Sequence, residues 1–293
     1  MKDILARAGA DARALHDGRV FVGRRRVKDG NTKVVPGDEL RIAAERRAAL
    51  PAVDILFQKD GLVACVKPAN MPTVPDHGGS HTSLVAIVAH QVGIDPTDIR
   101  VTSRLDREVS GVIVFALDPE SEARLRHARA SGTYTRRYVA IAGGAPFASE
   151  SAEGIWDAPI GRGKDPRHRA AHGPEGKESL TRWRVTGRAD AFVVLAVEPE
   201  TGRTHQIRVH ASHAGAPLFG DKDYGGIARV TQSLGTVVAL SRIALHAARV
   251  TVPGKSGPLT ADAPIPDELS NLWIQLGGVP SVWDTAVSCD LPT

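Results

Sequence analysis

The hydrophobic and polar positions of the chain follow two patterns, short apolar runs and longer segments with helical spacing. Apolar runs bounded by turn residues, as in ILFQKDGLVACV and TYTRRYVAIAGG, are typical of buried strands. Helical spacing appears in SLVAIVAHQVGI, a predicted helix that ends at Gly93, and between Asp118 and Gly132, where Asp118 fits an N-cap. From residue 51 to residue 293, the pattern therefore predicts one domain of mixed α and β structure.

The first 50 residues have a different pattern and are expected to form a small separate domain. ILARAGADARAL has helical spacing, and Gly18 ends the predicted helix. The next stretch, RVFVGRRRVKDGNTKVVPGDELRI, is typical of short strands joined by glycine-containing turns. A polar connector, ERRAALPA, follows. We therefore expect two domains, residues 1–50 and residues 51–293.

Three later segments complete the predicted layout. Residues 161–177 are polar, basic and rich in glycine and proline, so we expect a loop. THQIRVHASHA predicts a helix that Thr204 caps and Gly215 ends. The last ten or so residues have no periodic pattern, and no regular element is expected there.

Composition narrows the setting in which the chain works. The formal net charge of +4 and the pI of about 9.2 are a mild basic excess, carried mostly by arginine, which suits phosphates and base edges. No apolar run approaches the ~20 residues of a membrane span, and the N-terminus has no signal-peptide pattern. Cys65 and Cys289 lie far apart and suggest neither a disulfide framework nor a zinc site. A cytoplasmic protein without membrane attachment is therefore expected.

The segment SRLDREVSGV places a single carboxylate, Asp106, in a basic frame before a buried strand. A lone aspartate near arginines is usually a surface ion pair. Here Arg104 and Asp106 share one face if the segment is extended, and the strand behind them would hold the carboxylate rigidly. A nearby arginine keeps such a carboxylate ionised. That suits a nucleophile, a base or an electrostatic stabiliser, and not a general acid.

A second constellation lies in TGRTHQIRVHASHAGAPLFGDKDYGG. Arg208 follows the start of the predicted helix and can point at an anion or a carboxylate. His205, His210 and His213 suggest a metal site, but on a helix His205 lies on a different side from the other two, and no cysteine completes the set. We therefore expect no metal, and a structural role in a turn for Asp221.

Two weaker signals are basic. GRRRVKDG, which contains Arg24, Arg25 and Arg26, is either a solvated charged edge or a phosphate-binding stripe. Lys67 ends a predicted strand in VKPANMP, where it has either a structural or a substrate-binding role.

Several segments together resemble the RluA-type pseudouridine synthases. RLDREVSGVIVFA is similar to that family's RLDRxTSG segment, and the motifs occur in family order between about residues 53 and 270. The others that resemble the family are LVACVKPANMPTVP, TRRYVAIAGG, GRTHQIRVHASHAGAPLFGDKDYGG and RIALHAARV. Residues 1–50 resemble the small S-four-like RNA-binding domain that often precedes this catalytic domain.

The resemblance implies an α+β fold, with a mixed, largely antiparallel sheet, flanking helices and a central cleft. It places the catalytic aspartate at Asp106, its arginine partner at Arg208 and the tyrosine under the target base at Tyr138. Arg104 would enter the RNA helix when the uridine flips out. The other expected RNA-binding residues are Lys67, Arg203, His205, Gln206, Arg24, Arg25 and Arg26.

The reaction implied is isomerisation of uridine in ribosomal or transfer RNA to pseudouridine, which needs no cofactor. A monomer acting on RNA is expected. The alternative is a non-catalytic RNA-binding protein or RNA chaperone on the same scaffold. The chain departs from the family pattern where histidine, threonine, glycine and lysine are common, at Ser103, Val109, Asn70 and Leu117 respectively.

Overall fold

The protein consists of two compact units, Met1–Leu50 and Pro51–Thr293, each with its own hydrophobic core. The structure is a computed structural model. It describes residues 13–16, 20–23, 25–27, 29–35, 37–43, 51–75, 83–144, 153–232 and 235–293.

The N-terminal unit contains a short helix and a three-stranded antiparallel sheet in the order β2-β1-β3. The elements are α2 (Arg13–His16), β1 (Val20–Val22), β2 (Arg25–Val27) and β3 (Leu40–Ile42). Leu15, Val20 and Val27 are buried at its core, as the predicted short strands require. The first part of the predicted helix, ILARAGADA, lies outside the described residues.

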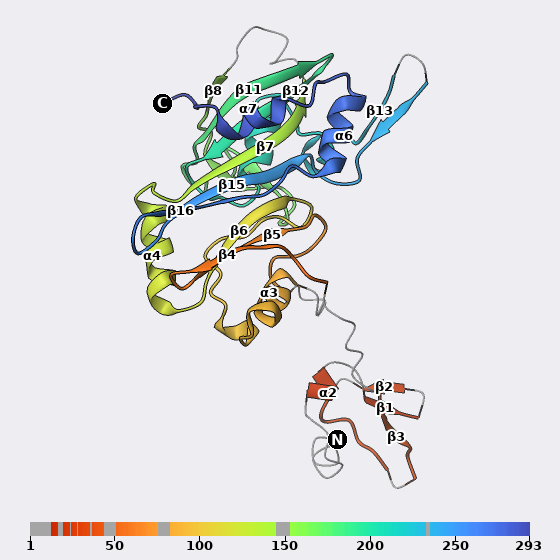
Figure 1. The fold of residues 1–293 in the computed structure, drawn as a ribbon. Helices are drawn as coiled ribbons and strands as arrows, with labels where there is room; N and C mark the ends of the chain where they lie inside the picture. The colour runs from red at the N-terminus through yellow and green to blue at the C-terminus, as the bar shows by residue number, and fades with distance from the viewer. Residues whose placement is uncertain are drawn as a thin grey trace. The chain divides into compact units, whose positions relative to one another are not determined.

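A nine-stranded mixed sheet forms the centre of the larger unit (Figure 1). Its path is β4-β5-β6-β15-β7-β12-β11-β8, and β16 pairs with β15 beside that path. β6 and β15 are parallel, and the other described pairs of this sheet are antiparallel. The strands are β4 (Ile55–Lys59), β5 (Leu62–Lys67), β6 (Ser110–Ala116), β7 (Thr135–Gly143), β8 (Glu153–Trp156), β11 (Thr181–Ala189), β12 (Phe192–Pro199), β15 (Leu245–Pro253) and β16 (Pro258–Asp262).

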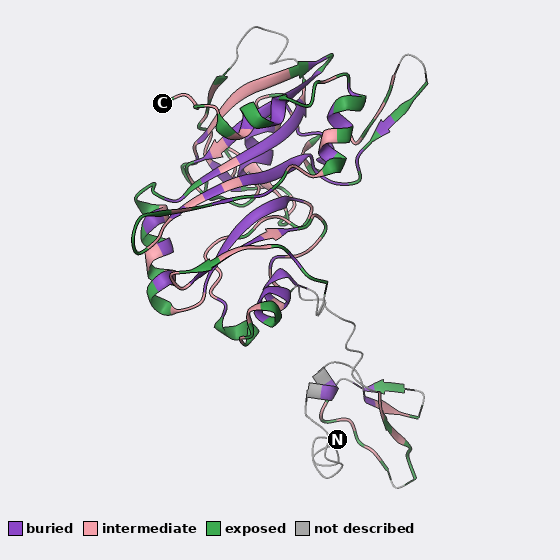
Figure 2. Cartoon of the chain, viewed as in Figure 1, coloured by how far each residue is buried: buried purple, intermediate pink, exposed green. Residues whose placement is uncertain are grey.

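Helices cover both faces of the sheet, so its middle strands are buried (Figure 2). α6 (Asp267–Gln275) and α7 (Val282–Ser288) pack on the face that carries Val139 and Ile141 of β7. α5 (Gln206–His213) packs on the other face. This alternation along β7 is the period of two that a buried strand requires.

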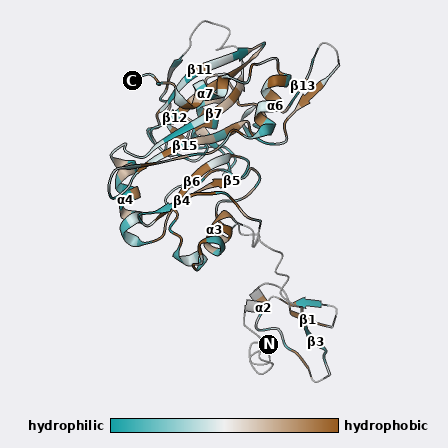
Figure 3. Cartoon of the chain, in the orientation of Figure 1, coloured by the Kyte–Doolittle hydropathy of each residue, from teal (hydrophilic) through white to brown (hydrophobic). Residues whose placement is uncertain are grey.

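The remaining elements are short helices and two small ribbons outside the central sheet. α4 (Pro119–Ala130) packs against β6 and β15. The apolar residues of α3 and β6 appear as brown segments in Figure 3. The other small elements are α3 (Leu84–Val92), η1 (Pro96–Asp98), η3 (Lys222–Tyr224) and two antiparallel ribbons, β9 (Ile160–Arg162) with β10 (Arg169–Ala171) and β13 (Arg229–Thr231) with β14 (Val237–Ala239).

Local helix signals were the most dependable part of the sequence prediction. Asp118 caps α4 through its carboxylate, which accepts the backbone N–H of Ser121 at 2.7 Å. α3 ends at Gly93 with a left-handed φ of 75°. Both predicted boundaries are confirmed, because each depends only on neighbouring residues.

Three expectations about local structure are wrong. The N-cap of α5 is His205, with φ of 57° and no side-chain cap, rather than Thr204. The segment expected to be a loop at 161–177 contains the β9–β10 ribbon. The C-terminal region contains α7, whose Val282 and Trp283 are buried against the sheet, so tertiary packing stabilises a helix that has little periodic signal.

The glycine after Ser110 explains how the Asp106 segment joins the sheet. Gly111 has φ of 118°, and a Cβ there would lie 2.2 Å from the carbonyl oxygen of Ala247. Only glycine therefore allows β6 to pair with β15 at this point. The loop that carries Asp106 enters the sheet directly beside this contact.

A buried serine–histidine pair lies at the same junction. Ser110 Oγ and His246 Nδ1 are 2.8 Å apart, and the His246 side chain is fully buried. Burial lowers the pKa of His246 to about 4. The imidazole is therefore neutral in the folded protein at neutral pH.

This pair should make the larger unit sensitive to acid. Between the pKa of about 6.5 in the unfolded chain and about 4 in the folded protein, the unfolded chain binds more protons, so the free energy of unfolding falls as the pH falls. We expect His246 to account for a loss of about 3 kcal/mol across this window. Urea unfolding at pH 7 and at pH 4 measures this loss. Between the two pH values, His246→Asn should lose less free energy of unfolding than the wild type. The control His90→Asn, at an exposed site on α3, should lose as much as the wild type. Equal losses in all three proteins would contradict the assignment.

Candidate active site

A cavity of about 480 Å³ opens on the α5 face of the sheet. One wall is the loop before β6, which carries Asp106. Tyr138 of β7 lies at its floor, and the segment from Pro199 to Arg208 forms the opposite wall. The cavity therefore brings together Asp106, Tyr138 and Arg208, the three residues predicted to be catalytic.

Lys67, the last residue of β5, holds the loop that carries Asp106. Lys67 Nζ donates hydrogen bonds to the carbonyls of Pro68, Met71 and Arg107, at 2.9, 2.7 and 3.0 Å. Lys67 is fully buried and does not line the cavity. Burial lowers its pKa to about 7, against the opposing charge of Asp106. Lys67 thus braces the loop, which corrects the expectation that it contacts substrate.

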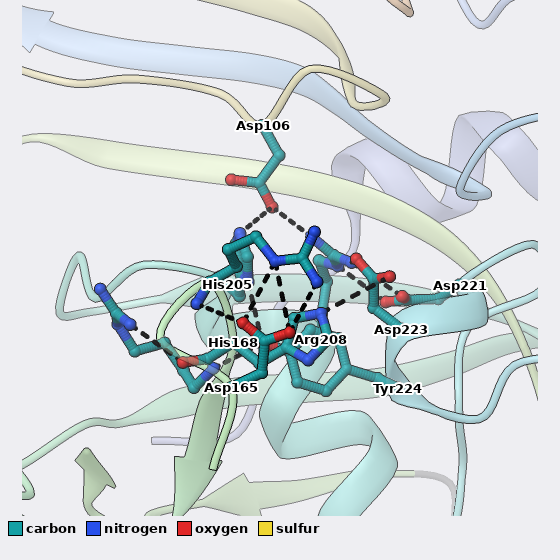
Figure 4. Close-up of polar contacts among 10 residues, drawn as sticks. Asp106, Asp165, His168, His205, Arg208, Asp221, Asp223 and Tyr224 are labelled. Atoms are coloured by element: carbon teal, nitrogen blue, oxygen red, sulfur yellow. Dashed lines mark hydrogen bonds and ion pairs between the residues drawn. The ribbon is translucent and has the colours of Figure 1, made fainter. Parts of the chain in front are cut away.

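Arg208 makes hydrogen bonds to three carboxylates at the site (Figure 4). Its Nε and Nη2 each donate to one oxygen of Asp221 at 2.8 Å, a bidentate pair in which the two side chains are only 4% and 1% exposed. The third nitrogen, Nη1, donates to Asp106 Oδ2 at 3.1 Å. Nη2 also contacts Asp223 Oδ2 at 3.1 Å. The predicted Asp106–Arg208 ion pair is therefore present.

The surrounding carboxylates keep the guanidinium charged. Burial alone lowers the pKa of Arg208, but hydrogen bonds and charge from Asp221 and Asp106 outweigh it and raise the pKa above its ordinary value. The ring of Tyr224 also lies against the guanidinium, 4.8 Å from centroid to Cζ. A single orientation of Arg208 results, and it fixes one oxygen of Asp106. Figure 4 shows the other oxygen directed away from these contacts.

His205 is placed to complete the polar side of the cavity. Tyr224 Oη accepts the Arg169 backbone N–H at 2.9 Å and lies 2.8 Å from His205 Nδ1. The Tyr224 hydroxyl can therefore donate its proton to Nδ1, which places the imidazole proton on Nε2. The Nε2 atom lies 3.8 Å from Asp106 Oδ2 and faces it. Burial lowers the pKa of His205, although Asp106 opposes this, so the neutral form is favoured.

Tyr138 presents an uncharged aromatic surface to the cavity. Its side chain is 7% exposed, and burial raises its pKa. Arg136, two residues earlier on the same face of β7, lines the same cavity. Two neighbouring residues of β7 therefore offer an aromatic ring and a cation to whatever enters.

The other residues predicted to bind substrate divide into three groups. Arg104 and Arg203 are exposed at the cavity, and Arg203 Nε donates to the Glu178 carbonyl at 3.1 Å. Gln206 lines the cavity but is buried. Its amide bonds to the 201–203 turn and to Leu180 and Thr181, so it braces the cavity wall, and its contact with substrate stays a prediction. In the N-terminal unit, Arg25 and Arg26 are exposed on β2, and Arg24 lies outside the described residues.

The histidine-rich helix does not form a ligand set. Both ring nitrogens of His210 have protein partners, Thr181 Oγ1 and the Ala158 carbonyl, each at 2.9 Å. Within the ranges that the structure describes, no group of three or more histidine, cysteine or acidic side chains is arranged to hold a metal ion. None of the helices in those ranges combines the length and apolar character that crossing a membrane requires.

The family departures have mild local consequences. Asn70 has φ of 63°, a left-handed conformation that asparagine tolerates. Ser103 Oγ lies 3.4 Å from Tyr134 Oη, and Val109 is buried in the same core cluster as Tyr138.

Sequence reasoning missed the acidic partners of Arg208. Asp221 was assigned to a turn, and Asp223 and Tyr224 were not assigned to the site. The available signal was the density of acidic and aromatic residues in GDKDYGG after an arginine on a buried helix, because carboxylates compensate the charge of a buried arginine.

Comparison with known proteins agrees with this geometry. Residues 61–213 match the family model described as RNA pseudouridylate synthase. The chain is 34% identical over 270 residues to "Ribosomal large subunit pseudouridine synthase D" of Vibrio parahaemolyticus, covering 87% of this chain and 82% of that protein. The protein of the same name from Nitrosomonas europaea is 32% identical over 252 residues, covering 85% and 72%.

A solved structure shares the fold. "Human RNA Pseudouridylate Synthase Domain Containing 1" superposes with a TM-score of 0.61 at 20% identity, covering 84% of this chain and 98% of that one. The chain belongs to the RNA pseudouridylate synthase family. It is therefore an enzyme, an isomerase that converts uridine in RNA to pseudouridine, and the non-catalytic alternative is set aside.

Proposed function

We propose that the protein modifies one or more uridines of ribosomal RNA, with Asp106 as the catalytic residue and transfer RNA as the second candidate substrate. The observation that carries this proposal is the Asp106–Arg208 ion pair at the wall of a cavity floored by Tyr138. The names of the relatives from Vibrio and Nitrosomonas favour the large ribosomal subunit.

The residues divide the reaction between them. As the glycosidic bond breaks, positive charge develops on the ribose, and the fixed Asp106 carboxylate stabilises it, as nucleophile, as base for the 2′ proton or through its charge. The freed uracil turns against Tyr138, and its carbon five forms the new bond to the ribose. Carbon five then loses its proton and N1 gains one, so the overall reaction is an isomerisation. Arg104, exposed at the cavity entrance, fills the gap in the RNA stack and offsets the unstacking cost of a few kcal/mol.

The substrate assignment is tested by mapping pseudouridines in total RNA from cells with and without the gene. We expect signal to disappear at one or more uridines of large-subunit ribosomal RNA. Loss in transfer RNA alone would overturn the ribosomal assignment, and unchanged maps would overturn both. Conversion of a 5-fluorouridine RNA to a rearranged product by the purified protein provides the matching assay in vitro.

We propose that the protein acts as a monomer. Cys65 and Cys289 are free thiols, as expected of a protein in the reducing cytoplasm.

We propose that the N-terminal unit is an S-four-like RNA-binding domain. One face of its sheet carries Phe21 between Arg26 and Arg41, whose guanidinium carbons lie 5.5 and 5.2 Å from the ring centroid. Register places both arginines directly opposite Phe21 on the flanking strands. Arginines beside an aromatic ring suit phosphates and unpaired bases.

Replacing Arg26 and Arg41 together by glutamine should therefore weaken RNA binding and leave chemistry intact. We expect a higher KM, a kcat near wild type, and a log–log salt slope for binding that is shallower by roughly 0.7 to 0.9 for each RNA phosphate that the variant no longer neutralises. The control Arg249→Gln removes an arginine that pairs with Asp262. A salt slope that stays at the wild-type value would contradict RNA binding by this face.

A further inference from the structure

Two cavity arginines that are not exposed, Arg129 and Arg136, have no carboxylate partner among the described residues. Arg136 is only 9% exposed; its Nη2 donates to the carbonyls of Pro199 and Thr201 at 2.9 and 2.8 Å, and its buried Nε has no partner. Arg129, near the end of α4, donates to the Thr102 carbonyl. Both line the same cavity as Asp106.

The two guanidinium groups converge on one point. Their central carbons lie 5.4 and 5.7 Å from the centroid of the same ring, that of Tyr134. A Cβ added to Gly202 would lie 2.6 Å from Arg129 Nη2 and 3.5 Å from Arg136 Nη1. Both tips therefore lie close to Gly202 at the cavity wall, and a side chain at this position would collide with Arg129.

This arrangement is costly without an anion. Burial and, after it, the charge of Arg136 lower the pKa of Arg129, which shows that the two cations oppose each other. Cation–π contact with Tyr134 offsets part of that cost. An anion at Gly202 would compensate both charges, and arginine forks match phosphate oxygens particularly well.

We propose that Arg129 and Arg136 bind one phosphate of the RNA backbone, next to the nucleotide whose base lies against Tyr138; this rests on the function proposed above. Arg136 and Tyr138 are two residues apart on the same face of β7, about 7 Å along the strand. The phosphate site and the base site thus lie within reach of one nucleotide. The occupant is a phosphodiester flanking the target uridine, and the site fixes which nucleotide of the strand enters the cavity.

A double-mutant cycle with modified RNA tests this site in the full chain. The probe is an RNA decamer with one uridine among adenosines, made with all phosphates or with an uncharged methylphosphonate on the 5′ or the 3′ side of that uridine. For the wild type, we expect one of the two methylphosphonates to weaken binding about tenfold. Arg129→Gln should bind the unmodified decamer about tenfold more weakly and lose nothing further with that methylphosphonate.

Matched variants separate a phosphate site from a structural brace. Arg126→Gln, on the same helix but exposed and paired with Glu122, should behave as the wild type. Arg136→Lys retains the positive charge and tests whether the second arginine contributes to the phosphate site. Thermal melting of this variant shows whether it is folded. For Arg129→Gln we expect a raised KM, a kcat near wild type at saturating RNA and an unchanged Tm.

The two proposals fail in different ways. If wild-type protein forms no pseudouridine in any RNA, the proposed function fails. If it is active but neither methylphosphonate weakens its binding, or Arg129→Gln shows the same methylphosphonate penalty as the wild type, the phosphate site is wrong. A lower Tm with unchanged KM in Arg129→Gln would assign the arginines to bracing alone.

Discussion

Asp106→Asn should lower pseudouridine formation by at least about 1000-fold while leaving RNA affinity equal or higher. The amide keeps the size of the side chain but removes the charge that stabilises the ribose as its glycosidic bond breaks. It also removes a negative charge near the RNA phosphates, which favours binding. Single-turnover assays and RNA titrations with the full chain measure the two effects separately.

The geometry makes this variant a clean test. Asp106 Oδ2 is engaged by Arg208 Nη1 at 3.1 Å, and the other oxygen points away from that contact in Figure 4. An asparagine can still place its carbonyl oxygen against Arg208, so the loop should keep its position. Asp165→Asn, in an exposed pair with Arg167, is the control and should retain activity. Turnover by Asp106→Asn above about one per cent of wild type would remove Asp106 from the catalytic role.

The fold was predictable from sequence where local signals were sufficient. The Asp118 cap, the end of α3 at Gly93 and the buried strand β6 depend on neighbouring residues, and all three occur as expected. The helix α7 was not predicted, because it is stabilised by the packing of Trp283 on the sheet and not by a local signal. The α5 cap was misplaced because His205 adopts a left-handed backbone conformation, which is uncommon for residues other than glycine and which the helical spacing does not indicate.

The candidate site was predictable only as far as its motifs reached. Asp106, Tyr138 and Arg208 were found because each lies in a recognisable segment. Lys67 and Gln206 were assigned to substrate, and burial commits their polar atoms to nearby carbonyls, backbone amides and hydroxyls. Such assignments need the third dimension, because a sequence does not show which polar groups meet in the folded chain.

The same limit applies to the paired arginines. Arg129 lies on α4 and Arg136 on β7, and nothing in either segment indicates that both reach Gly202. Their convergence arises around the ring of Tyr134, which lies in the connection between the end of α4 and the start of β7.

Arg208→Lys should lower kcat by roughly 100-fold, although the positive charge is retained. One guanidinium holds both oxygens of Asp221 through two nitrogens and reaches Asp106 through the third. A lysine has a single nitrogen and cannot span these positions. Asp106 then loses its fixed orientation, and the buried Asp221 loses part of its pairing.

Stability and pH dependence distinguish lost geometry from lost charge. Because Asp221 is only 1% exposed, we expect a lower Tm for Arg208→Lys, equivalent to a few kcal/mol at most. The pKa of Arg208 is raised above its ordinary value and a lysine paired with carboxylates also stays protonated, so the shape of the pH–rate profile should not change. RNA affinity should stay near wild type.

Asp223→Asn is the matched control for this prediction. Its carboxylate contacts the same Nη2 of Arg208 at 3.1 Å, but its side chain is 48% exposed, so its loss should change kcat by less than about tenfold. Asp221→Asn should instead resemble Arg208→Lys, because it breaks the bidentate pair that orients the guanidinium. If Arg208→Lys kept full kcat while Asp106→Asn was inactive, Asp106 would act without Arg208, and the exposed Arg203 would become its candidate partner. Equal damage from Asp223→Asn and Asp221→Asn would show that total negative charge, rather than the bidentate geometry, sets the position of Arg208.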